Sequence, residues 1–173
     1  KELEIAKIGM ANGIADAEPL TELEKVDMIV KAEKAFGEFL DALKCDWRND
    51  PNSNNTPKRV AKAYVRDLWA GRYNGPPSIT GFPSDGYDGM VLSKLNRIVE
   101  HFGRRGAIQE QLTVAIHNAV NKICKGNLGA AVMIEATHNC VSCRGVKHFG
   151  ASMKTSKLSG SFLDEDSARA EFY

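Results

Sequence analysis

The chain has 173 residues, of which 43% are hydrophobic, and this is enough to build one domain with a packed core. Its formal net charge is only +1, so a protein dedicated to binding nucleic acid is not expected. No apolar run approaches the length that crosses a membrane, and no membrane partner is expected either. The four cysteines are too few and too scattered for a disulfide framework, which favours reduced thiols and a cytoplasmic location.

A long amphipathic helix is predicted near the start of the chain. Thr21 and Glu24 have the spacing of a capping box, which places the helix start at Glu22. Apolar residues then recur with helical period as far as about Lys44. They are Val26, Ile29, Val30, Phe36, Phe39, Leu40 and Leu43. One face of this helix is therefore expected to be apolar.

A second helix is predicted to begin with Thr56 as its N-cap and Pro57 at its first position. It is expected to end at Gly71. Its predicted buried face consists of Val60, Ala61, Tyr64, Val65 and Leu68. The following residues, 72–90, are rich in proline and glycine and indicate an irregular connection.

Two more helices and two strands complete the prediction. Ser93 can cap a third helix, whose inner residues are Leu95, Ile98, Val99 and Phe102. A fourth helix ends near Gly126, and its inner residues are Ile108, Leu112, Ile116, Val120 and Ile123. Strands are predicted at 130–136 and 150–160. Because two strands with open edges do not form a stable sheet, further strands are expected from other subunits or from residues that this chain lacks.

The segment 132–148 carries the densest group of reactive side chains. On an extended strand His138 and Cys140 would share one face, and imidazole and thiolate are ligands that zinc prefers. Three interpretations remain open: a strand-end histidine beside a small buried cysteine, a compact site that adds Cys143 and His148, or a site completed by distant ligands. Arg144 adds a guanidinium suited to phosphate.

Three other groups of polar residues lie near a helix start or on one helix face. They are Ser93, Lys94 and Arg97; Arg59 and Lys62; and Gln109 and Glu110. A helix N-terminus favours a bound anion, and paired cations favour phosphate. The alternative for each group is a solvated helix face, and a glutamate in a first turn is favourable for its charge alone.

Taken together, four segments resemble GTP cyclohydrolase I. They are Asn-Thr-Pro-Lys-Arg-Val-Ala-Lys at 55–62, Leu-Ser-Lys-Leu-Asn-Arg-Ile-Val at 92–99, Ile-Gln-Glu-Gln-Leu-Thr at 108–113, and His-Asn-Cys with Arg-Gly-Val at 138–146. They occur in that family's order and near its spacing. The resemblance covers roughly Val26 to Phe172.

The resemblance implies an α+β chain with the tunnelling fold, in which two long helices cover one face of an antiparallel sheet. Residues 1–71 would form an N-terminal helical region, and 72–173 the catalytic domain. In this family the subunits join their sheets into a barrel and assemble as a homodecamer. The implied reaction is zinc-dependent hydrolysis of GTP to 7,8-dihydroneopterin triphosphate and formate.

The family's residue roles carry over to matching positions. Cys140 would bind Zn2+, and His138 would act as general acid and base. Glu110 would accept hydrogen bonds from the guanine, with Gln109 beside it. The residues expected around the triphosphate are Ser93, Lys94, Arg97, Arg144, Arg59 and Lys62.

One departure from the family is large. The Cys-Glu-His-His motif, which supplies the family's two other zinc ligands, does not occur between the connector and Ser93, because Met90 runs directly into Val91. Two strands are missing with it. Either a further segment belongs between Met90 and Val91, or the deletion is genuine. The first is favoured, since losing two strands should destroy a small sheet while the flanking pattern here is intact.

A genuine deletion would instead suggest an inactive scaffold or regulatory homologue that binds nucleotide. A third reading, a tunnelling-fold nitrile reductase with a cysteine nucleophile and NADPH, has no support here beyond the shared fold.

Overall fold

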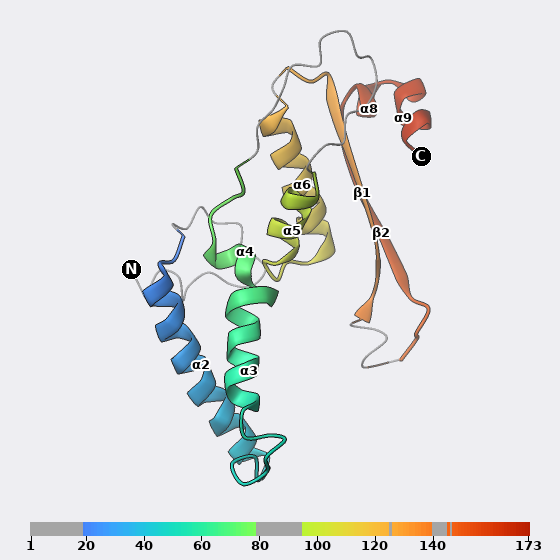
Figure 1. Ribbon diagram of the computed structural model, residues 1–173. Helices are drawn as coiled ribbons and strands as arrows, with labels where there is room; N and C mark the ends of the chain where they lie inside the picture. Colours follow the sequence, from blue (N-terminus) through green and yellow to red (C-terminus); the bar gives the residue numbers. More distant parts are fainter. Residues whose placement is uncertain (1–18, 79–94, 125, 140–144, 146) are drawn as a thin grey trace. The chain divides into compact units, whose positions relative to one another are not determined.

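The computed structural model describes residues 19–78, 95–124, 126–139, 145 and 147–173 (Figure 1). The chain divides into two compact units, which are described separately. The first comprises the chain up to Pro77 together with Gly103–Gly106, and the second comprises Ser78–Phe102 and Ala107–Tyr173. Helices and a small antiparallel sheet are compatible with the predicted α+β class. In the described ranges no helix has the length and apolar character needed to cross a membrane.

The first unit begins with α2 (Glu22–Ala42), and the predicted capping box is confirmed. The Glu24 backbone N–H donates to Thr21 Oγ1 at 3.3 Å, and the Thr21 backbone N–H donates to Glu24 Oε2 at 2.8 Å. The helix ends slightly before the predicted position. Lys44 adopts a left-handed conformation with φ of 57°, which an α-helix cannot continue through.

The second predicted helix is divided into three parts: α3 (Thr56–Ala63), the π-helical segment η2 (Tyr64–Leu68) and α4 (Ala70–Tyr73). The predicted N-cap was wrong by one residue, because Asn55 occupies that position and Thr56 is already helical. The predicted end at Gly71 was also wrong, since helical structure continues to Tyr73. The π segment follows a different period, so Leu68 is 54% exposed although the 3.6-residue period placed it inside.

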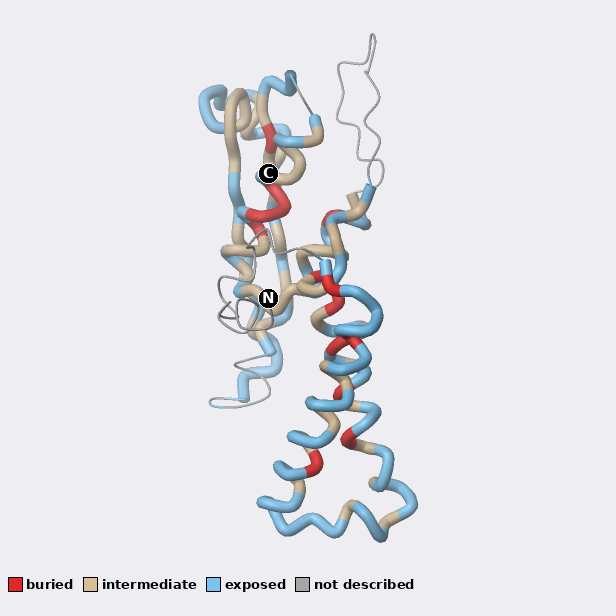
Figure 2. The backbone as a smooth tube through the Cα atoms, turned by 90° about the vertical axis from the view of Figure 1, so that its left-hand side faces the viewer, coloured by how far each residue is buried: buried red, intermediate tan, exposed pale blue. Residues whose placement is uncertain are grey.

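The apolar face predicted for α2 is largely exposed in the described structure. Val26 is 49% exposed, and Val30, Phe39 and Leu43 are each more than half exposed. Figure 2 shows long exposed stretches along this helix. Helical periodicity places the apolar residues on one face of α2, but it does not show whether another element of the same chain covers that face.

Polar contacts fix the start of α2 instead. The ammonium of the buried Lys25 donates to Glu22 Oε1 at 2.9 Å and to Asn74 Oδ1 at 2.7 Å. The Leu20 backbone N–H donates to the Tyr73 carbonyl at 2.9 Å. The beginning of α2 is thus bound to the end of α4.

The second unit contains α5 (Leu95–Gly103), α6 (Gln109–Ile123), and two antiparallel strands, β1 (Gly129–Thr137) and β2 (Ser152–Gly160). Both predicted strands are confirmed. Pairing runs from Gly129 opposite Gly160 to Thr137 opposite Ser152. Two short helices follow, α8 (Ser161–Asp164) and α9 (Asp166–Phe172). Figure 1 shows α6 against the sheet, and it contacts both strands.

The core of the second unit lies between α6 and the sheet, and it is partly polar. Ile116 and Ala130 are 4% and 5% exposed, but Thr113 and His117 are buried beside them at 1% and 3%. Ile108, predicted as an inner residue, is 56% exposed, because it is the N-cap and precedes the first helical turn. The described sheet has two strands.

Candidate functional site

The first turn of α6 carries two of the predicted substrate-binding residues, and it lies over the sheet. Glu110 is exposed there, in a turn that has no side-chain N-cap because Ile108 occupies the capping position. Its neighbour Gln109 is half-buried and points to the strands. Gln109 Nε2 lies 2.8 Å from the Met153 carbonyl and 3.1 Å from the Ile134 carbonyl. The side chain of Gln109 therefore bridges β1 and β2.

Two threonines complete a cluster that we call the near clamp, consisting of Gln109, Thr113 and Thr155. Thr113 Oγ1 donates to the Gln109 carbonyl at 2.8 Å and lies 2.6 Å from Thr155 Oγ1. Thr155 Oγ1 also lies 3.3 Å from Gln109 Nε2. The near clamp joins the start of α6 to both strands.

A second cluster, the far clamp, lies two turns further along α6 and consists of His117, Asn121 and Ser159. His117 Nε2 is 3.2 Å from the Ala130 carbonyl and 3.0 Å from Ser159 Oγ. Because the carbonyl can only accept, its contact requires the tautomer with hydrogen on Nε2, and Asn121 Nδ2 lies 3.3 Å from Nε2 and 3.4 Å from Nδ1. The far clamp is a satisfied polar contact within the core.

The predicted acid and base, His138, lies one residue beyond the end of β1. The strand ends at Thr137, so His138 does not lie on one continuous strand with β1. Its backbone N–H donates to the Ala151 carbonyl at 2.9 Å, which holds it beside the residue that precedes β2. Glu135, on the strand itself, forms an exposed ion pair with Lys154 at 3.3 Å.

The predicted phosphate-binding residues are spread along the chain. Arg97 is exposed on α5 in the second unit, and Lys62 is exposed on α3 in the first. Arg59, also on α3, donates from Nη2 to the Asn52 carbonyl at 3.0 Å and to Thr56 Oγ1 at 3.1 Å. Ser93, Lys94, Cys140 and Arg144 lie outside the described residues, as does the junction between Met90 and Val91.

No group of three or more histidine, cysteine or carboxylate side chains with metal-site geometry occurs among the described residues. Two cysteines in these ranges, Cys45 and Cys124, are exposed free thiols.

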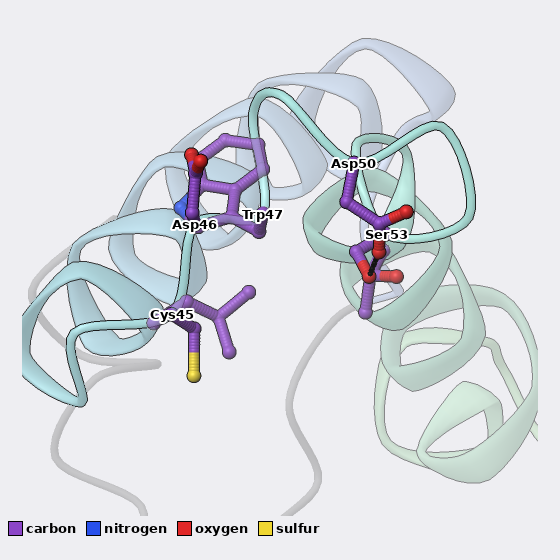
Figure 3. A pocket seen from close by; sticks show the side chains of 7 residues that line it. Cys45, Asp46, Trp47, Asp50 and Ser53 are labelled. Carbon is purple, nitrogen blue, oxygen red and sulfur yellow. Dashed lines mark hydrogen bonds between the residues drawn. The ribbon is translucent and has the colours of Figure 1, made fainter.

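A shallow hollow of about 250 Å³ lies where α2 leads into α3 (Figure 3). Its residues are Leu40, Cys45, Asp46, Trp47, Asp50, Ser53 and Thr56. Asp50 accepts hydrogen bonds from Ser53 Oγ and from the Asn52 backbone N–H, which lower the pKa of its carboxyl group. These bonds hold the loop together, and none of the predicted site residues lines the hollow.

Comparison with known proteins identifies the family. The family model for GTP cyclohydrolase I matches residues 83–173. A GTP cyclohydrolase 1 from Shewanella denitrificans is 31% identical over 179 residues, which cover 83% of this chain and 82% of that protein. The GTP cyclohydrolase 1 of Pasteurella multocida is 32% identical over 176 residues, covering 81% and 80%. That of Chlorobaculum tepidum is 45% identical over 87 residues, covering 49% and 38%.

The chain belongs to the GTP cyclohydrolase I family. The family-model match includes the predicted site residues from Ser93 to Arg144, while Arg59 and Lys62 precede it.

The alignments also indicate an internal difference from relatives in the GTP cyclohydrolase I family. The alignment with the Shewanella protein spans 179 residues. Because 83% of this 173-residue chain is about 144 residues, about 35 aligned positions have no counterpart in this chain. In the 87-residue alignment with the Chlorobaculum protein, 49% of the chain is about 85 residues, and almost no such positions remain.

Sequence reasoning missed the two clamps. The prediction for α6 followed its apolar residues and passed over a polar series that recurs every four positions: Gln109, Thr113, His117 and Asn121. Residues four apart lie on one helix face, so this spacing was the available signal. Thr155 and Ser159 are likewise four apart on β2, and both face α6.

Proposed function

We propose that this chain is a GTP cyclohydrolase I, which hydrolyses GTP to 7,8-dihydroneopterin triphosphate and formate. Membership of the family carries the proposal. Relatives named GTP cyclohydrolase 1 align with about four fifths of the chain at 31–33% identity. The family model also spans most of the residues proposed for the site.

Glu110 is the proposed anchor for the guanine. Guanine presents two neighbouring N–H donors, and an ionised carboxylate accepts two hydrogen bonds side by side. Glu110 is exposed on the first turn of α6, which supports access by a ligand. Gln109 lies beside it.

His138 is the proposed proton carrier for opening the five-membered ring. An imidazole changes charge near neutral pH, so it can accept a proton in one step and return it in another. Hydrogen bonding of its backbone to Ala151 supports a fixed position for the ring at the end of β1.

The triphosphate is proposed to bind a set of hydroxyl and cationic side chains, some of which come from neighbouring subunits. The set is Ser93, Lys94, Arg97, Arg144, Arg59 and Lys62. Guanidinium groups bind phosphate oxygens in pairs, and ammonium groups add charge without fixed geometry. Exposure of Arg97 and Lys62 supports this role.

Zinc is the proposed cofactor, and the residues of this chain fit it only in part. The Cys140 thiolate has the right donor chemistry, but the described residues contain no cluster that could complete a site around it. When bound, zinc in such sites supplies hydroxide near neutral pH. The remaining ligands would lie in a segment between Met90 and Val91, and the unmatched positions in the alignments support that explanation.

The second candidate is an inactive nucleotide-binding scaffold. The direct run of Met90 into Val91, without the Cys-Glu-His-His motif, favours it. It predicts GTP binding without release of formate.

We also propose the tunnelling fold, closure of sheets from several subunits into a barrel, assembly as a homodecamer and a cytoplasmic location. A described sheet of two strands supports the barrel, because pairing with neighbouring subunits would cover its edges. Free thiols at Cys45 and Cys124 support a reducing compartment.

The test is formate release and pterin fluorescence when the purified protein is incubated with GTP, with zinc measured in the same sample. The wild type is expected to be active. Cys140→Ala should lose zinc and activity while keeping its oligomeric size. Glu110→Gln should raise KM for GTP, and the matched control Glu135→Gln, which changes an exposed carboxylate on β1, should not. Binding of GTP by the wild type without formate release would establish the scaffold instead.

A further inference from the structure

We infer that Thr113 and Thr155 are positioning residues for guanine recognition, because they hold the turn that carries Glu110. The inference rests on the proposed function of Glu110. Neither threonine needs to touch the substrate. Their role is to fix the backbone of the first turn of α6 against the sheet.

The first turn of α6 needs such an anchor. Helix starts have unpaired backbone N–H groups and fray when no side chain caps them. Ile108 cannot cap, and it is 56% exposed, so it contributes little packing. Among the described residues, the hydrogen bonds of the near clamp bind this turn to the sheet: Gln109, Thr113 and Thr155.

The donor and the acceptor of each hydrogen bond in the near clamp can be assigned. Thr113 has one hydroxyl hydrogen, and the Gln109 carbonyl, which can only accept, takes it. Thr155 must therefore donate to Thr113 across their 2.6 Å contact. The oxygen of Thr155 can then accept from Gln109 Nε2 at 3.3 Å, through a hydrogen that the amide shares with one of the two strand carbonyls.

These three hydrogen bonds close a ring that begins at the Gln109 side chain and returns to the Gln109 backbone. Hydrogen bonds arranged in such a chain polarise one another and strengthen together. Thr113 is 1% exposed, so water cannot replace a missing member from its side. Loss of either hydroxyl should release the turn next to Glu110.

The far clamp provides an internal control. It joins the same helix to the same strand through Ser159, but it acts two turns away from Glu110. A general weakening of the contact between α6 and the sheet should follow from damage to either clamp. Mispositioning of Glu110 should follow from damage to the near clamp alone.

We therefore expect Thr113→Val, which preserves shape and removes the hydroxyl, to raise KM for GTP about tenfold with little change in kcat. The reason is that an anchor lost equally from the ground state and the transition state weakens binding alone. Thr155→Val should behave alike. Thr113→Ser retains the hydroxyl and should restore KM to within about twofold of the wild type. Ser159→Ala should lower the melting temperature and leave KM within the same range.

A double-mutant cycle with Glu110→Gln distinguishes positioning from general damage. If Thr113 acts through Glu110, Thr113→Val should add little to KM in the Glu110→Gln background. Additive effects, or an equal rise in KM for Ser159→Ala, would overturn the inference. Absence of formate release by the wild type would instead reject the proposed function, so the two failures are separate. If Thr113→Val does not fold, Thr155→Val, at a half-buried position, provides the same comparison.

Discussion

Asp41 shows how a single exposed carboxylate can link a helix end to the loop that follows it. Its Oδ2 accepts a hydrogen bond from Arg48 Nη2 at 2.8 Å, and its Oδ1 accepts one from Trp47 Nε1 at 2.9 Å. The Arg48 guanidinium, and to a smaller extent the Trp47 N–H, lower the pKa of Asp41 below its usual value of 3.8. The ionised form is therefore favoured in the folded chain.

The lowered pKa of Asp41 determines how the stability of the fold depends on pH. A carboxyl group whose folded pKa is lowered stabilises the fold above its unfolded pKa, and this contribution is lost as pH falls through the folded pKa. Asp41→Asn should therefore be less stable than the wild type at pH 7, and the difference in stability should shrink as pH falls below the usual carboxyl pKa of 3.8. Urea unfolding midpoints measured from pH 7 to pH 2.5 test this. A constant difference over the whole range would contradict it.

The capping box of α2 gives a second prediction at this scale. Thr21→Ala removes the oxygen that accepts from the Glu24 backbone, and should lower the free energy of unfolding by about 1 kcal/mol. Thr56→Ala is the matched control, because Thr56 is the first helical residue of α3 and not its N-cap, and its hydroxyl accepts from the Arg59 side chain instead of a helix-start N–H. Urea denaturation of the three proteins should rank Thr21→Ala lowest. Equal losses in both variants would reject the cap as the cause.

At the scale of elements, two glycines allow the ends of the strands to meet. Gly129 pairs with Gly160, and Gly160 has φ of 56° and ψ of −138°, which side chains other than hydrogen avoid. A Cβ atom built on Gly160 would lie 1.9 Å from the Leu128 carbonyl oxygen. Neither the backbone conformation nor the neighbouring backbone tolerates a larger residue there.

Gly160→Ala should therefore destabilise the second unit by at least about 3 kcal/mol. The control is Gly103→Ala, because a Cβ atom there meets nothing within 4 Å. Hydrogen exchange of the β1 and β2 amides should accelerate in the first variant and not in the second. Unchanged protection in Gly160→Ala would show that the turn after β2 relaxes easily.

Prediction from the sequence succeeded for some elements and failed for others. The capping box at Thr21 gave a correct prediction because its two partners are three residues apart. The apolar run at 130–136 also gave a correct prediction from its residue types alone, although β1 pairs with β2 further along the chain. The π turn after Ala63 was not predictable, since it departs from the helical period itself. The near clamp was missed because it depends on Thr155, 42 residues after Thr113, and apolar periodicity says nothing about such pairs.

At the scale of the whole molecule, the residues proposed for the site are distributed over both compact units. Arg59 and Lys62 belong to the first, and Glu110 and His138 to the second. The common role proposed for them follows from the family resemblance. The same resemblance drew attention to the junction between Met90 and Val91, where the family has two strands and a zinc-binding motif.

Peptide mapping tests that junction directly. Trypsin cleaves after Arg72 and Lys94, so an uninterrupted chain yields one peptide covering 73–94. We expect the natural protein to lack this peptide and to yield peptides that contain Cys-Glu-His-His. The peptide covering 98–104 lies between two arginines and serves as a digestion control. Detection of the intact 73–94 peptide would establish the deletion and favour the scaffold.

The polar face of α6 also restricts how this helix can move. Apolar side chains can pack against one another in many registers, whereas each clamp pairs particular hydrogen-bond donors with particular acceptors. If α6 slid by one turn, the imidazole of His117 would approach Thr155, and the carbonyl groups of Ile134 and Met153 would lose their donor. Ratchet-like shifts of this kind operate in some allosteric proteins. Here such a shift would break the hydrogen bonds of both clamps, which therefore keep α6 in one register against the sheet.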